Sequence, residues 1–335
     1  MKWTNIAILF FLLELSLFII LDMRTLSLTG VINQKIEYNK ALDSAIDDGV
    51  IELVEVDSQR NLVLNKEIAV EQFYQSLYAN FGVMGNDRLE GKMRGYIPVI
   101  LVTDEDGFYL CYSDIYNLGE ETFITQRWSE KQPYAYEISD YIINFTLGTY
   151  LTVYDKNTNE VYKGEYKELI GMFQNTLLAD EETFHTVRRH TIISTIEENM
   201  NYYINKHNNI AYQLGITYQF WLPEIDKTDW YRTIDDISML VIFQGYPFSS
   251  ASMDTYNRYA IGGARIRKTR VYYITEESGK KYYHKSDCPH LSNSTYLTAY
   301  FTYEECALEG LILVRKYLIW INQSCKKVLN LWLIK

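Results

Sequence analysis

The sequence begins with an apolar stretch from Ile6 to Leu21, IAILFFLLELSLFIIL, in which Glu14 and Ser16 are the polar side chains. With its flanks, this stretch approaches the ~20 residues that a helix needs to cross a bilayer core about 30 Å thick. A cleavable signal peptide is the competing interpretation, but it has a shorter apolar core and ends at a small-x-small site. Here Asp-Met-Arg-Thr-Leu follows Leu21 instead. The pattern therefore predicts a transmembrane signal anchor over residues 1–24.

The charges that flank the apolar stretch indicate its orientation. Lys2 and the free amino group precede it, whereas Asp22 and Arg24 follow it. Positive charge is enriched on the cytoplasmic side of membrane helices, which favours a cytoplasmic N-terminus. We therefore expect a single-pass protein of the cell membrane whose C-terminal domain is extracytoplasmic.

Glu14 is the costliest residue of the predicted span, because a carboxyl group at mid-bilayer costs about 3 kcal/mol on insertion scales. Two interpretations stay open: a protonated acid tolerated in an otherwise apolar helix, and a lateral contact with another membrane helix. The segment FFLLELSLFIIL resembles the hydrophobic, Glu-containing stalk of type IV pilin-like and Tad-type minor pilin proteins. That resemblance implies that Glu14 helps a subunit dock into its assembly. Unlike those proteins, the chain has no Gly-Phe processing site before the apolar stretch.

A helical stalk is predicted to follow over residues 25–49, as the pilin resemblance also implies. Its apolar residues recur at roughly helical spacing; they are Leu28, Ile32, Ile36, Leu42 and Ile46. We expect Asp47-Asp48-Gly49 to end this helix, because glycine commonly follows the last helical turn.

The pattern over residues 50–267 predicts an α+β ectodomain with a mixed, largely antiparallel sheet. Its first half indicates a hairpin at 50–64, a helix at 66–81 with Ile68, Phe73, Leu77 and Phe81 on one face, and a strand pair at 96–112 joined by the turn Asp104–Gly107. Its second half indicates short strands at 133–151, then a turn at 155–159 before a further strand, and then a helix at 180–206. After this helix, the pattern indicates strands at 217–222 and 239–244 around a loop at 223–230, and a strand pair at 258–274.

Composition narrows the function classes. The 335 residues include 30 Tyr, which favours a folded chain containing sheet. The net charge of −11 would repel nucleic acid, so we expect no nucleic-acid partner. A basic cluster is expected to be a solvated strand edge; it comprises Arg265, Arg267, Lys268 and Arg270.

No catalytic pattern stands out, and we expect a protein that is not an enzyme. The sequence has no P-loop and no Gly-x-Ser-x-Gly. His185 and His190 lie five residues apart, so they do not share a helix face as i,i+4 ligands would. The acidic run Asp104–Asp106 is either a solvated hairpin turn or a cation site, since carboxylates suit Ca²⁺.

The C-terminal part contains a distinctive pattern, Tyr283-His284 followed by Cys288-Pro-His290. With its flanks at 271–312, it resembles the Ada-like metal-binding module of bacterial secreted nucleases. That resemblance implies a tetrahedral zinc site anchored by Cys288. The closing Pro-Cys-x-x-Cys of the module is missing, so residues 268–317 form a degenerate Cys/His module. A complete zinc site needs His284, Cys288, His290 and Cys306; the alternative is a metal-free hairpin and helix.

Residues 318–335 form a basic, apolar tail that differs from the acidic chain before it. Two interpretations stay open: an authentic tail lying on a membrane surface, and a segment translated out of frame after the point where the module pattern stops.

These patterns predict a membrane-anchored structural or assembly protein of a bacterial cell envelope, related to pili or secretion. Its expected partners are the membrane and other membrane or envelope proteins, and no cofactor is expected other than zinc in the C-terminal module. The alternative is a ligand-binding or sensory ectodomain without catalytic activity, which the strand pair Ile97–Tyr112 motivates.

Overall fold

The computed structural model describes residues 3–56, 62–118, 121–174, 176–213, 215–248, 254–264, 272–277, 280–285, 298–300 and 312–313. The chain divides into two compact units, residues 1–265 and 266–335. At the level of fold class the expectation is confirmed: the chain combines a long N-terminal helix with antiparallel sheets.

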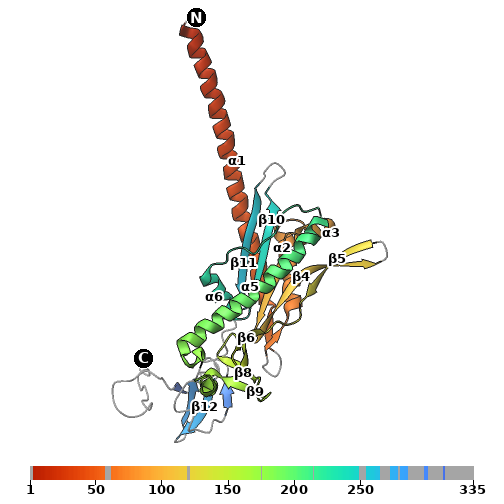
Figure 1. The fold of residues 1–335 in the computed structure, drawn as a ribbon. Coiled ribbons are helices and arrows are strands. Elements are labelled where there is room, and N and C mark those ends of the chain that lie inside the picture. Colours follow the sequence, from red (N-terminus) through yellow and green to blue (C-terminus); the bar gives the residue numbers. More distant parts are fainter. Residues whose placement is uncertain are drawn as a thin grey trace, which may run out of the picture. The chain divides into compact units, whose positions relative to one another are not determined.

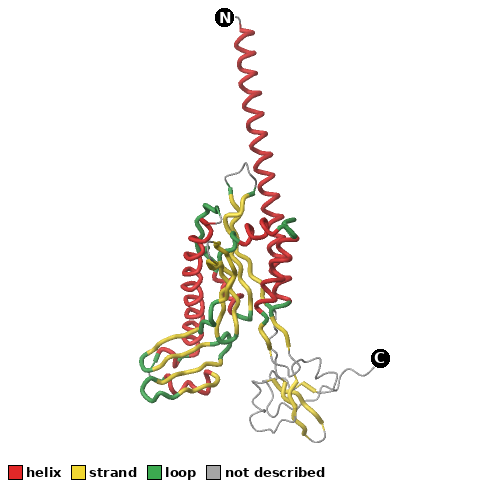
Figure 2. Tube along the Cα trace, turned by 90° about the vertical axis from the view of Figure 1, so that its right-hand side faces the viewer, coloured by secondary structure: helices red, strands yellow, loops and turns green. Residues whose placement is uncertain are grey.

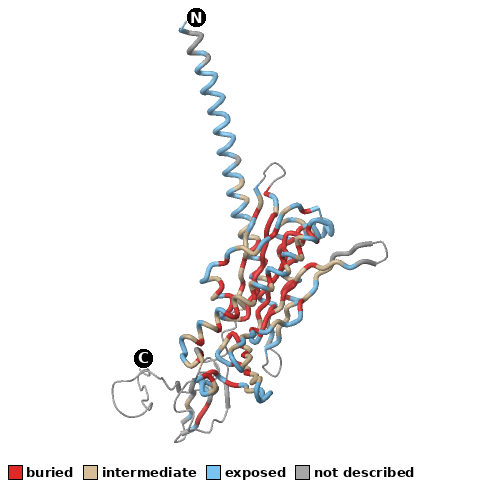
Figure 3. The backbone as a smooth tube through the Cα atoms, viewed as in Figure 1, coloured by how far each residue is buried: buried red, intermediate tan, exposed pale blue. Residues whose placement is uncertain are grey.

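The first element is a single helix, α1, which runs from Trp3 to Ile51 over 49 residues. At 1.5 Å per residue it is ~74 Å long. Figure 1 shows α1 projecting from the first unit, and Figure 3 shows that its exposure ends where it reaches the other elements. The helix is long and apolar enough to cross a membrane, a property that signal sequences share, and its most apolar window is not buried at all.

Two short elements and two helices follow α1. Strands β1 (Val54–Val56) and β2 (Leu62–Leu64) form the predicted hairpin, and α2 (Lys66–Asn80) and α3 (Asp87–Arg94) come next. The α2 residues Phe73, Tyr74, Leu77 and Tyr78 are buried, but Ile68 is 54% exposed. The prediction was wrong at Ile68, because a step of five residues turns a helix by about 140° and moves it off the face of Phe73.

The central sheet has five antiparallel strands in the order β11-β10-β3-β4-β5. They are β3 (Val99–Asp104), β4 (Gly107–Leu118), β5 (Glu121–Trp128), β10 (Ser238–Pro247) and β11 (Thr255–Gly263). The apolar run of β3 is buried throughout because it lies in the middle, with Leu101 opposite Leu110 on one side and Leu240 on the other. The predicted hairpin at 96–112 is confirmed as β3 and β4.

Helices cover both faces of this sheet. The end of α1 packs against α2, β11 and β10, and Tyr74 of α2 accepts a hydrogen bond from Gln126 of β5. On the other face, α5 (Glu181–Gln213) contacts β3 and β4, and α6 (Lys227–Ile234) contacts β10 and β11. Figure 2 shows the sheet lying between helices.

A second antiparallel sheet in this unit follows the order of the chain. Its strands are β6 (Tyr134–Ile138), β7 (Tyr141–Phe145), β8 (Tyr150–Asp155) and β9 (Val161–Glu165), followed by the short helices α4 (Tyr166–Leu169), η1 (Ile170–Phe173) and η2 (Leu177–Ala179). The start of α5 packs on this sheet, because the Phe184 ring makes an edge contact with Phe145 of β7 at 5.7 Å between centroids and stacks on Tyr166 of α4 at 3.9 Å.

The segment between α5 and α6 differs from the prediction. Residues 217–222 were expected to form a strand but are irregular. The Asn208 side chain of α5 takes the place of a strand partner: it accepts a hydrogen bond from the Phe220 amide (2.7 Å) and donates one to the Phe220 carbonyl (3.0 Å). The predicted loop at 223–230 contains the first turn of α6, which Asp226 caps through the Thr228 amide.

The second unit contains β12 (Tyr272–Glu277), β13 (Lys280–Lys285), β14 (Thr298–Tyr300) and β15 (Ile312–Leu313). Their order is β14-β12-β13-β15, and the β13–β15 pair is parallel. The predicted strand pair at 258–274 was wrong: β11 pairs with β10, whereas β12 pairs with β13 and β14. The basic cluster at 265–270 and the tail at 318–335 lie outside the described residues.

Candidate functional site: the projecting helix and its junction

Glu14 lies on the projecting part of α1, where it is exposed together with the neighbouring apolar residues. Hydroxyl groups on this part of α1 are satisfied within the helix: Ser16 donates to the Leu12 carbonyl and Thr25 to the Leu21 carbonyl, both at 2.9 Å. Among the residues that the structure describes, Glu14 has no hydrogen-bond or ion-pair partner. Glu14 thus differs from Ser16 and Thr25, whose side chains bond within the helix.

An aromatic cluster joins α1 to the domain; we call it the junction. It is centred on Tyr38, whose ring lies 4.8 Å from Phe81 and 5.4 Å from Tyr256 between centroids and stacks on Phe248 at 5.7 Å. Tyr246 completes it, in an edge contact with Tyr38 at 5.5 Å. Burial raises the pKa of Tyr246 and Tyr256 to about 12, so these rings are neutral at physiological pH.

Polar contacts fix the rotation of α1 against β11 just below the aromatic rings. The Tyr256 hydroxyl donates to Asn39 Oδ1 (2.9 Å), and Arg258 donates to the Asn39 carbonyl (3.1 Å). Arg258 also forms an ion pair with Asp43 at 2.8 Å, which helps to raise the pKa of the guanidinium group against the effect of its desolvation. Sequence spacing alone did not indicate these contacts, since residues 39 and 258 are far apart along the chain.

Two glycines allow α1 to approach its neighbours closely. A Cβ atom at Gly49 would lie 2.8 Å from Met239 Cε and 2.9 Å from the Ala69 carbonyl, and one at Gly262 would lie 2.7 Å from Val50 Cγ1. Gly49 was expected to end the helix, but α1 continues to Ile51. The role that the structure gives Gly49 is close packing, because a side chain there would push α1 away from α2 and the sheet.

Two buried basic residues of α5 are unusual for a domain core. His207 bonds through Nε2 to the Gly95 carbonyl at 2.9 Å, and its Nδ1 is buried without a partner among the described residues. Burial lowers the pKa of His207 to about 4, so the ring is neutral. Arg188 donates to the carbonyls of Thr146 and Leu147 between β7 and β8, and burial lowers its pKa. Both residues bind backbone carbonyls, which is a structural use of their donors.

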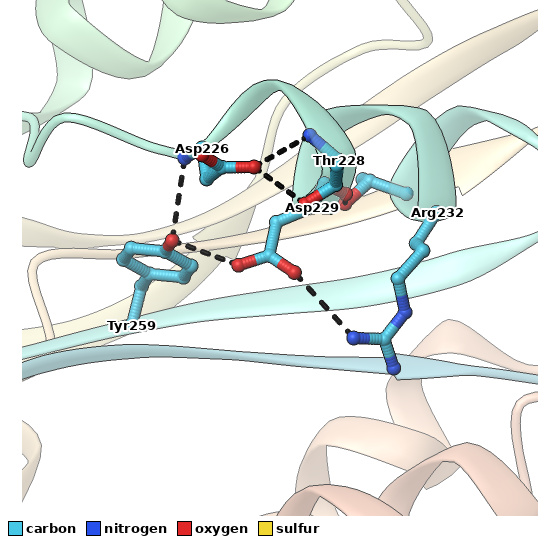
Figure 4. A network of polar contacts seen from close by, with 6 residues as sticks. Asp226, Thr228, Asp229, Arg232 and Tyr259 are labelled. Atoms are coloured by element: carbon cyan, nitrogen blue, oxygen red, sulfur yellow. Dashed lines mark hydrogen bonds and ion pairs between the residues drawn. The ribbon is translucent and has the colours of Figure 1, made fainter.

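A polar network surrounds the start of α6 (Figure 4). Asp226 accepts hydrogen bonds from the amide and hydroxyl groups of Thr228, while Asp229 accepts one from the Tyr259 hydroxyl at 2.9 Å and pairs with Arg232 at 3.4 Å. Burial is the largest cause that raises the pKa of Tyr259, which keeps its hydroxyl a donor. The network caps α6 and ties it to β11, and its groups are occupied with one another.

The structure describes one of the four candidate metal ligands. His284 lies on β13 opposite Tyr273 of β12, whereas Cys288, His290 and Cys306 lie outside the described residues. Within the described ranges, no group of three or more His, Cys, Asp or Glu side chains is placed to hold a metal ion. In the acidic turn, Asp104 and Asp106 both pair with Lys131, which is how a solvated hairpin turn balances its charge.

No protein-family model, curated protein or solved structure matches this chain. The features of the chain that bear on its function are therefore α1 and the junction. Sequence reasoning identified Glu14 but missed the junction residue Tyr38 and the nearby Asn39 and Gly262, which also position α1 against the domain. The available signal was the change along α1 from an almost wholly apolar sequence to one that mixes apolar with polar residues.

Proposed function

We propose that this chain is a membrane-anchored structural or assembly protein of a bacterial cell envelope, which acts through contacts of α1 with other membrane helices. The proposal extends the resemblance of FFLLELSLFIIL to the stalk of pilin-like proteins. The observation that carries it is the Glu14 carboxyl, to which no described residue forms a hydrogen bond or an ion pair, on a helix that is built into the domain at its other end.

The junction supports this proposal because it makes α1 a mechanical part of the domain. Leu42 and Ala45 are fully buried, and Tyr38 contacts rings from both β10 and β11. A flexible tether would need none of these contacts. A helix held rigidly from membrane to sheet transmits its rotation and depth to the domain, which is what an assembly subunit requires.

Glu14 supports a lateral contact within the membrane. A carboxyl group in hydrocarbon is costly when it is alone and is stabilised by a hydrogen-bonding partner on a neighbouring helix. The hydroxyl groups of Ser16 and Thr25 need no such partner, because they bond to their own helix. The contact should therefore depend on residue 14 and not on polarity of the span in general.

The test is crosslinking in native membranes, with Glu14→Leu compared against Ser16→Ala. We expect Glu14→Leu to remain in the membrane fraction and to lose crosslinked species at least tenfold, whereas Ser16→Ala keeps them. Glu14→Gln should retain part of the crosslinking, because an amide still donates and accepts hydrogen bonds. Unchanged crosslinks in Glu14→Leu would mean that the acid is merely tolerated and would overturn the proposal.

A further inference from the structure

One face of the projecting part of α1 carries a continuous stripe, which we call the upper stripe. Its members are separated by three or four residues and all are exposed; they are Phe11, Glu14, Phe18, Leu21, Thr25, Leu28, Ile32 and Ile36. Steps of three and four keep side chains within a sector about 100° wide, as on a coiled-coil helix. Glu14 therefore lies in line with apolar residues that reach far beyond it along the helix.

Leu28, Ile32 and Ile36 of the upper stripe come after the ~20 residues that a bilayer accommodates. Contact with lipid therefore does not explain why these positions are apolar. Leu28 is 62% exposed and Ile32 is 57% exposed. Outside the upper stripe, most of the exposed positions from 29 to 37 are polar, namely Thr29, Asn33, Lys35 and Glu37; Gly30 is the exception. The domain does not cover this face either, because Val31, Gln34 and Tyr38 are the half-buried positions there.

The same spacing continues into the domain, where the face is covered. After Ile36 it runs through Asn39, Asp43, Ile46 and Val50. Asn39 and Asp43 bond to Arg258 of β11, and Gly262 of β11 brings its backbone close to Ile46 and Val50. One face of one helix is thus packed against a neighbour along its lower third. Above that point, the part of the chain that the structure describes places no neighbour against the same pattern.

We infer that the upper stripe is the interface for a second copy of this chain, in a parallel, in-register pair of α1 helices. This inference rests on the proposed function, since it names the partner of the Glu14 contact. Two copies anchored in one membrane share direction and depth, so each presents Glu14 opposite Glu14 and Leu28 opposite Leu28. A protonated carboxyl both donates and accepts hydrogen bonds, which makes Glu14 complementary to itself.

The size of the upper stripe fits a stable pair. It extends from residue 11 to residue 36, which is between three and four heptads, the length over which such a spacing predicts a coiled coil. In this heptad spacing Leu21 and Leu28 occupy d positions and Ile32 occupies an a position. Leucine at d with isoleucine at a is typical of two-stranded coiled coils. A polar residue in such a seam fixes register at some cost in stability, which is the role the pair gives Glu14.

Cysteine crosslinking of the full chain in membranes tests the inference. Cys288, Cys306 and Cys325 are changed to Ser, and the buried Cys111 is kept, because burial raises its thiol pKa to about 12 and keeps it unreactive. Leu28→Cys and Ile32→Cys are then compared with Leu26→Cys and Asn33→Cys, which are exposed on other faces of the same turns. Two differently tagged copies are expressed together and oxidised.

We expect Leu28→Cys and Ile32→Cys to give a disulfide-linked species carrying both tags, at least fivefold more than the two control positions. Adding Glu14→Leu to Leu28→Cys should reduce it several-fold. Equal crosslinking at all four positions, or linked species that carry one tag and another protein, overturns the second-copy inference. The mass of the chain in the membrane and soluble fractions separates the two levels: a chain cleaved after residue 24 and found in the soluble fraction contradicts the proposed function itself.

Discussion

The two parts of α1 use one continuous helix for opposite purposes. From Phe10 to Leu26 the described side chains are exposed all round, and Leu26 itself is 66% exposed. From Leu42 to Val50 apolar side chains are buried, and Leu42 is fully so. The difference does not come from the chemistry of single residues, because leucine occurs in both parts. It comes from whether the chain supplies a surface to cover them.

This contrast separates the part of α1 that stabilises the domain from the part that is available for association with other molecules. The lower part belongs to the core, so changes there should unfold the domain. The upper part is exposed and contributes no buried side chain to the domain core, so we expect changes there to affect membrane insertion or association instead. Each of the following predictions separates the two parts, beginning with the largest expected effect.

Leu42→Ala is expected to reduce the free energy of unfolding by about 2–5 kcal/mol, because it removes buried methyl groups and leaves a cavity. Leu26→Ala is the matched control on the same helix, and it should change that free energy by less than about 0.5 kcal/mol. Urea unfolding of the full chain in detergent, followed by tryptophan fluorescence, measures both. Similar losses in the two variants would contradict the division of α1 into two parts.

Acid is expected to weaken the domain but not the insertion of α1. The folded pKa of His207 is about 4, below its ordinary value of 6.5, so the unfolded chain binds more protons between these values. The free energy of unfolding should therefore fall as the pH falls from about 6.5 to 4. The total loss is on the order of 3 kcal/mol, complete below the folded pKa. Unfolding midpoints at a series of pH values measure it.

His207→Gln is the control for this pH dependence, because an amide still donates to the Gly95 carbonyl but does not titrate. Most of the pH dependence between 6.5 and 4 should disappear in this variant. The remainder is expected from His185, whose pKa is also lowered, chiefly by desolvation and then by Arg188. An unchanged slope in His207→Gln would show that the buried ring is not its source.

Gly262→Ala is expected to cost about 1–3 kcal/mol, because the new Cβ atom would overlap Val50 and press on Ile46 where α1 meets β11. Gly91→Ala provides the comparison: nothing lies within 4 Å of a Cβ atom there, and alanine should stabilise α3 by about 0.5–1 kcal/mol. Thermal unfolding of the two variants should shift the midpoint in opposite directions. A stabilising Gly262→Ala would mean that α1 does not pack closely on β11.

The sequence predicted the elements whose signal is local. The apolar stretch of α1, the hairpin of β3 and β4, and the apolar spacing of α2 each lie within one segment. The misses depend on distant partners: residues 217–222 look like a strand, yet Asn208 provides the hydrogen bonds that a strand would need. The α6 helix could have been predicted from the sequence, because Asp226 is a good N-cap and Trp230 and Ile234 share a helix face.

The candidate site divides in the same way. Glu14 was predicted from the sequence because a carboxyl group within an apolar stretch is a local anomaly. The junction and the polar contacts beside it were not predicted from the sequence. Asn39 and Arg258, for example, come together only when α1 packs on β11. The candidate zinc ligands Cys288, His290 and Cys306 stay a prediction, since they lie outside the described residues.

The central claim is that α1 remains attached to the domain and anchors it outside the membrane. Protease added to intact spheroplasts tests this directly, followed by mass analysis of the fragments that remain with the membrane. We expect digestion of the chain beyond Asp48 and a protected membrane fragment that begins at the N-terminus and contains Glu14. Protection of the whole chain until the spheroplasts are lysed, or a released domain lacking the residues before 25, would contradict the claim.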